Sequence, residues 1–106
     1  MEIIKTKYSC AEECIEIFED YIIINNKHQN QTQTTHILFK HLIYLQLHNY
    51  DCSSQLISSI ELVMKDNIRL QYLTNNKIYF TCDDECKYVF NKLFTAFKKY
   101  QNQKIY

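Results

Sequence analysis

Apolar and polar residues recur with a helical period over three stretches in the first two thirds of the chain. The capping-box pair Ser9 and Glu12 precedes apolar residues at helical spacing, which predicts a helix over residues 10–24. Residues 36–48 are the most apolar segment and are expected to form a second helix, buried nearly all round. Apolar residues at intervals of three and four then predict a third helix over 52–65.

The last third of the chain predicts a β-hairpin followed by an amphipathic helix. Residues 68–74 alternate between apolar and polar, and residues 77–82 form a second run of strand-favouring types. Asn75 and Asn76 lie between them, and asparagine tolerates the positive φ that a two-residue hairpin turn requires. Acidic residues begin and lysines end the final helix, predicted over 84–100, as the helix dipole favours.

Together these elements predict one α+β, mostly helical domain over residues 1–106. Three helices, a hairpin and a last helix follow one another as in a winged-helix module. In the alternative, residues 36–48 are a strand in a small antiparallel sheet flanked by helices, since short apolar runs fit either state. The polar, low-complexity residues 25–35 predict a flexible loop.

Composition narrows the classes of function. The 106 residues include no glycine and no proline, which excludes glycine-rich phosphate loops, Rossmann fingerprints and nucleophile elbows. Net charge is zero and Arg69 is the only arginine, so a dedicated nucleic-acid or membrane-surface protein is not favoured. The chain shows neither a signal peptide nor a long apolar run, which predicts an intracellular protein, in the cytoplasm or nucleus, without a membrane partner.

Two pairs of cysteines share the spacing C-x₃-C, and each pair falls near a predicted helix start. Four thiolates brought together there would hold Zn²⁺ tetrahedrally. The same pairs would form two disulfides under oxidising conditions, or remain free thiols in a reducing cell. The candidate metal ligands are Cys10, Cys14, Cys82 and Cys86.

Charge and aromatic residues gather toward the C-terminus. Residues 67–106 carry seven basic and three acidic residues, whereas residues 1–24 carry two basic and six acidic ones. A nucleic-acid surface would use the basic side chains Arg69, Lys77, Lys87, Lys92, Lys98 and Lys99. A protein interface would use the aromatic stripe Phe90, Phe94, Phe97 and Tyr100, whose default role is core packing.

These observations favour a non-catalytic protein–protein interaction module that acts as a small subunit of a larger assembly or as a homodimer. A winged-helix-like nucleic-acid-binding protein using the C-terminal basic face is the first alternative. A small domain stapled by zinc or disulfides is the second. No catalytic constellation, no cofactor other than zinc and no small-molecule substrate is indicated by the sequence.

Overall fold

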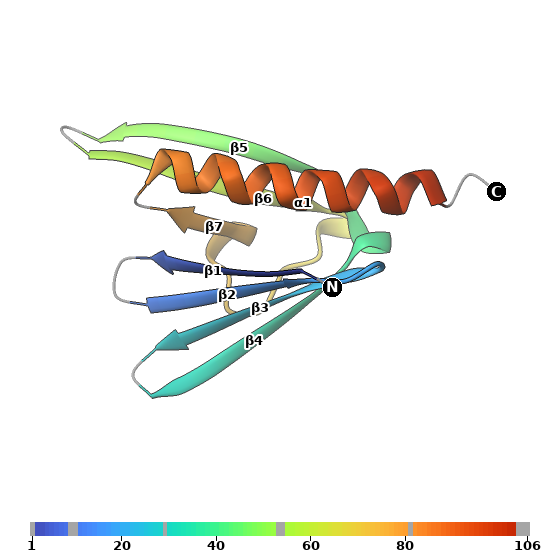
Figure 1. Cartoon of the computed structure of the whole chain (residues 1–106), viewed down its shortest axis with the longest axis horizontal. Coiled ribbons are helices and arrows are strands. Elements are labelled where there is room, and N and C mark those ends of the chain that lie inside the picture. Colours follow the sequence, from blue (N-terminus) through green and yellow to red (C-terminus); the bar gives the residue numbers. More distant parts are fainter. Residues whose placement is uncertain (1, 9–10, 29, 53–54, 81, 104–106) are drawn as a thin grey trace.

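Two antiparallel sheets and a C-terminal helix make up the described part of the chain (Figure 1). The computed structural model describes residues 2–8, 11–28, 30–52, 55–80 and 82–103. The first sheet is a meander in the order β1-β2-β3-β4, with bounds Glu2–Tyr8, Ala11–Ile17, Tyr21–His28 and Gln31–Leu38. The second has the order β5-β6-β7, with bounds Leu42–Cys52, Gln55–Met64 and Lys77–Phe80.

The helix α1, Asp83–Gln103, runs along the β5–β6 hairpin and contacts all three strands of the second sheet (Figure 1). Three 3₁₀ turns complete the chain: η1 at Phe39–His41, η2 at Lys65–Asn67 and η3 at Thr74–Asn76. The turn η1 lies where the chain passes from the first sheet to the second, and β1 of the first sheet approaches β7 of the second. The helix predicted over 84–100 is present as α1, which is slightly longer than predicted.

Branched apolar side chains on alternate positions form the inner face of the first sheet. One cross-strand row joins Ile15, Ile24 and Thr35, and the other joins Ile17, Ile22 and Ile37. All six side chains are buried, so the period is two rather than 3.6. The burial of these rows fixes the register, because a slip of one residue would turn each row toward water.

The predicted helix over 10–24 is wrong, because this segment forms most of the β2–β3 hairpin. Ile15 and Ile22 are seven residues apart and fit helical spacing, but they also fit two strands joined by a turn. Isoleucine is β-branched and packs well on a pleated surface, which favours the strands. The predicted capping residue Ser9 lies outside the described residues.

Residues 25–28 and 31–35, within the segment predicted to be a flexible loop, belong to β3 and β4 instead. Their polar side chains pair across the strands: the Thr34 hydroxyl donates to Asn25 Oδ1 at 2.9 Å. Asn30, at the turn, has φ 65, a left-handed conformation that asparagine tolerates. A polar tract can thus form a strand where its backbone hydrogen bonds to the neighbouring strand are made and its side chains are exposed to solvent.

The predicted helices over 36–48 and 52–65 are also wrong. The first segment ends β4, passes through η1 and begins β5, while the second lies largely in β6. Ile60, Leu62 and Met64 alternate inward along β6 and give this strand a buried face. The alternative with 36–48 as one strand is wrong too, because η1 interrupts this segment between β4 and β5, and α1 is the only α-helix in the described part of the chain.

The predicted hairpin is half wrong. Strand β7 exists, but it pairs with β6 and not with residues 68–74. Asn75 and Asn76 adopt φ 55 as expected, yet Asp66, Asn67 and Tyr72 also have positive φ, which an extended strand cannot accommodate. The Asn76 side chain accepts from Leu70 N and donates to Ile68 O, both at 2.8 Å, and so replaces the missing ladder. Because the described residues contain one α-helix and no such wing, the winged-helix outline is wrong.

The inner stripe of α1 closes the core between the sheets. Its buried residues recur at intervals of three and four and are Cys86, Val89, Leu93, Phe97 and Tyr100. Phe39, in η1, meets this stripe, with ring centroids 5.6 Å from Phe97 and 5.5 Å from Tyr100. The helix therefore joins the turn between the sheets to the second sheet.

Neighbouring residues of α1 should differ sharply in their effect on stability. Leu93 is fully buried and Phe94 is 41% exposed. We expect Leu93→Ala to lower the free energy of unfolding by about 2–5 kcal/mol, because it leaves a cavity. Phe94→Ala should change it by no more than about 0.5 kcal/mol. Urea denaturation of both variants measures this, and equal losses would contradict the orientation of the helix.

Candidate functional site

The outward side of α1 carries large side chains that the fold does not use. Tyr88 is 54% exposed and Phe94 is 41% exposed, although both lie on the helix that closes the core. Phe90 is half-buried, and its ring stacks on that of Phe94 with centroids 5.9 Å apart. Exposed aromatic side chains on a helix are typical of protein-binding surfaces.

Each exposed ring lies under a lysine one helical turn later. Lys92 Nζ is 5.7 Å from the centroid of the Tyr88 ring, and Lys98 Nζ is 5.4 Å from that of Phe94. Both pairs have the i, i+4 spacing that brings side chains together on a helix surface. An ammonium over a ring is attracted to its π face, so the two aromatic side chains are held in place and remain exposed.

A groove runs between α1 and the β2–β3 turn. The turn contributes Ile17, Phe18 and Glu19, and the groove has a volume of about 540 Å³. Phe18 stacks on Tyr21 with ring centroids 4.5 Å apart, and Phe18 N donates to Tyr21 O at 2.9 Å. The helix contributes Asn91, Lys92, Thr95, Ala96, Lys99 and Gln103. This volume lies within the usual range of ligand-binding pockets.

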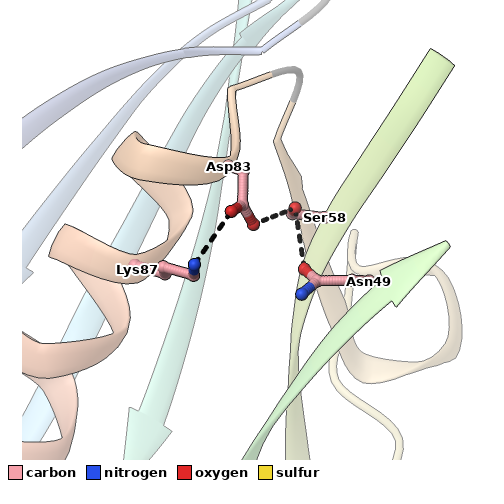
Figure 2. A network of polar contacts seen from close by, with 4 residues as sticks. All are labelled: Asn49, Ser58, Asp83 and Lys87. Atoms are coloured by element: carbon pink, nitrogen blue, oxygen red, sulfur yellow. Dashed lines mark hydrogen bonds and ion pairs between the residues drawn. The ribbon is translucent and has the colours of Figure 1, made fainter. Parts of the chain in front are cut away.

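A polar network holds the start of α1 to the second sheet (Figure 2). Asp83 accepts from the buried Ser58 hydroxyl at 2.8 Å and pairs with Lys87 Nζ at 3.1 Å. Asn49 of β5 lies beside Ser58, with its side-chain amide 2.9 Å from the hydroxyl oxygen. The network joins β5, β6 and the first turn of the helix.

The orientation of the Asn49 amide follows from counting protons. Ser58 has one hydroxyl proton, so it donates to Asp83 or to Asn49 but not to both. With the Asn49 amide nitrogen turned toward the network, it donates to Asp83 Oδ1 at 3.1 Å and to Ser58 Oγ at 2.9 Å. Ser58 then donates to the carboxylate, and every polar group is satisfied.

This network shifts two pKa values in opposite senses. The Ser58 hydrogen bond, followed by that of Lys87, lowers the pKa of Asp83 below its usual 3.8. The hydrogen bond to Asp83 raises the pKa of Lys87 above 10.5. Both charges are thus favoured at neutral pH, and the network is suited to fastening the helix start. Lys87 is already engaged there.

Cys14, Cys82 and Cys86 are free thiols. Cys14 lies on a strand, so the helical spacing expected for its pairing with Cys10 does not apply, and Cys10 itself lies outside the described residues. Burial, followed by the charge of Asp83, raises the pKa of Cys86 to about 12 and opposes its thiolate. No cluster of three potential metal ligands occurs among the described residues.

Three polar residues of β5 and β6 include the chemical types of an acyl-transfer triad. His48 Nε2 lies 2.7 Å from Glu61 Oε1, and Ser59 is paired with His48 across the strands. Ser59 is fully buried, and its hydroxyl has no hydrogen-bond partner among the residues that the structure describes. A substrate carbonyl cannot reach a buried nucleophile, so this arrangement cannot act as such a triad in the folded state.

The structure places the members of the predicted aromatic stripe, and those of the predicted basic surface, in different environments. Of the aromatic stripe, Phe94 is exposed and Phe90 is half-buried, whereas Phe97 and Tyr100 pack on Phe39 in the core. The basic residues lie on three segments: Arg69 precedes η3, Lys77 begins β7, and the remaining four belong to α1. The lysines of α1 and the exposed aromatics therefore share one element, and the groove beside them was not predicted.

Searches against protein-family models, curated proteins and solved structures gave no match to this chain. No helix within the described residues combines the length and apolar character needed to cross a membrane.

The Asp83 network should make stability depend on pH at the acidic end. Because its pKa is lowered on folding, the charge of Asp83 stabilises the fold above pH 3.8, and this contribution is lost as the pH falls through the folded-state value. Asp83→Asn should therefore flatten the acidic limb of a stability–pH curve obtained by urea denaturation. Asp84→Asn, in the same turn and exposed, is the matched control. Equal slopes for both variants would exclude the network as the cause.

Proposed function

We propose that this protein is a non-catalytic protein–protein interaction module, acting as a small subunit of a larger assembly or as a homodimer, with the outward side of α1 as its docking surface. The observation that carries the proposal is the pair of exposed rings, Tyr88 and Phe94, each under its own lysine. Aromatic residues dominate the binding energy of many interfaces, and here they are positioned before any partner arrives.

The two sides of α1 have different roles, and this supports the proposed docking surface. One stripe of the helix is buried against the sheets, and the first turn is fastened by the network around Asp83. A rigid element that is fixed on one side can present its other side with little loss of conformational entropy on binding. The exposed rings add nothing to the core, so a binding role accounts for them.

The free cysteines favour a reducing compartment, so we place this protein inside the cell, in the cytoplasm or nucleus. The hypothesis of a nucleic-acid function loses its main support, because it depended on a winged-helix fold and this chain has a different fold. Of the basic side chains expected to contact nucleic acid, Arg69 and Lys77 lie outside α1, and Lys87 is paired with Asp83.

Site-specific photo-crosslinking tests the docking surface. A benzophenone amino acid in place of Phe94 should crosslink to a discrete partner in extracts of the source cells, or to a second copy of the chain. The same photo-reactive residue in place of Thr32, exposed on β4, is the control position. Sedimentation of the purified chain at micromolar concentration then distinguishes a homodimer from a hetero-complex.

The proposal predicts crosslinks at position 94 that are lost when Tyr88→Ser is added, with circular dichroism unchanged. Crosslinks of equal yield at positions 94 and 32, or none at position 94 in a chain that sediments as a monomer, would contradict it.

A further inference from the structure

The groove beside α1 has an apolar floor that is preformed. Ile17 is buried, Phe18 and Ala96 are half-buried, and the small side chain of Ala96 leaves space above it. The opposite wall is the β2–β3 turn, which is held from two sides: Phe18 stacks on Tyr21, and Asp20 O accepts from Phe39 N at 2.9 Å. A guest side chain would therefore enter a groove whose shape is already fixed.

The helical rim of this groove is basic. Lys92 and Lys99 line it, seven residues apart and therefore on one side of the helix. From residue 86 to residue 103, α1 carries four lysines and no acidic residue. Lys99 has no ion-pair partner among the described residues. Lys99 therefore favours an occupant that carries a negative charge beside it.

The polar side chains that line the groove indicate which class of molecule it binds. Asn91, Thr95 and Gln103 offer side-chain donors and acceptors suited to the backbone of an extended chain. Glu19 on the opposite wall repels a second row of negative charge, as a phosphate backbone would present. The groove lacks arginine, the usual residue for phosphate recognition. An apolar floor under a single basic rim fits a protein segment better than a nucleic acid.

We infer that this groove binds an extended acidic segment of a partner protein, with an aromatic or branched apolar side chain on the floor and a carboxylate at Lys99. This rests on the proposed function and specifies the chemistry of the partner. The segment would lie between the β2–β3 turn and α1, next to the exposed Tyr88, so that groove and exposed rings form one continuous docking surface.

Selection of random twelve-residue peptides displayed on phage, with the intact chain as bait, tests this inference without a known partner. Enriched peptides should contain several acidic residues around one aromatic or branched apolar residue. Their affinity, measured by fluorescence anisotropy with synthetic peptides, should fall at least about tenfold in Lys99→Glu, because a charge pair becomes a repulsion. Higher salt should weaken binding to the unmodified chain.

Two further variants separate the groove from general charge. Thr95→Trp fills the groove without changing charge and should also weaken binding about tenfold or more. Lys65→Glu makes the same charge reversal on an exposed lysine of η2, and it should leave binding within about twofold. Thermal unfolding of each variant verifies that the fold is retained.

Enriched peptides without acidic character, no enrichment at all, or binding that survives both Lys99→Glu and Thr95→Trp would overturn the inference. Crosslinking at position 94 is independent of the groove. If it still yields a partner, the groove inference alone fails. If position 94 gives no crosslink while acidic peptides bind as described, the site extends over the groove only, and the larger docking surface is wrong.

Discussion

The contact between Phe39 and the C-terminal half of α1 is the one on which the rest of the structure depends. Phe39 is buried in the turn between the two sheets, and its ring meets those of Phe97 and Tyr100. Neither sheet is wide enough to bury its inner face alone. Helix α1 covers the second sheet, and Phe39 brings the passage from β4 to β5 under the same helix.

The two sides of α1 follow from this constraint. Once the stripe from Cys86 to Tyr100 is committed to the core, the residues on the opposite side of the helix face outward, whatever their chemistry. Lysines and polar residues at those positions need no explanation beyond solvation. Tyr88 and Phe94 do, because exposing them gains nothing for folding. The network of Asp83 with Ser58 and Lys87 fixes where the helix begins, and so which residues face the groove (Figure 2).

The sequence predicts this helix correctly because its signals are local: acids at the start and apolar residues at intervals of three and four. Strands β2, β3, β4 and β6 are not predicted, because the information that decides them is non-local. Ile15, Ile22 and Ile37 match helical spacing within their own segments, and only the cross-strand rows show that they share one face of a sheet. Residues 68–74 alternate like a strand, yet Tyr72 and the side-chain bonds of Asn76 turn the chain away. Phe94 is predicted as an interface residue, but Tyr88 is not part of the predicted aromatic stripe. The groove could not be predicted, since Phe18 reaches it only through the β2–β3 turn.

A double-mutant cycle between Phe39 and Phe97 tests the central claim most directly. The free energy of unfolding would be measured by urea denaturation for Phe39→Leu, Phe97→Leu, the double variant and the unmodified chain. Rings in direct contact predict that the double variant loses less stability than the sum of the single losses, by about 0.5–1.5 kcal/mol. Losses that add to within about 0.3 kcal/mol would mean that the two rings do not meet, and would contradict the placement of α1 across the turn between the sheets.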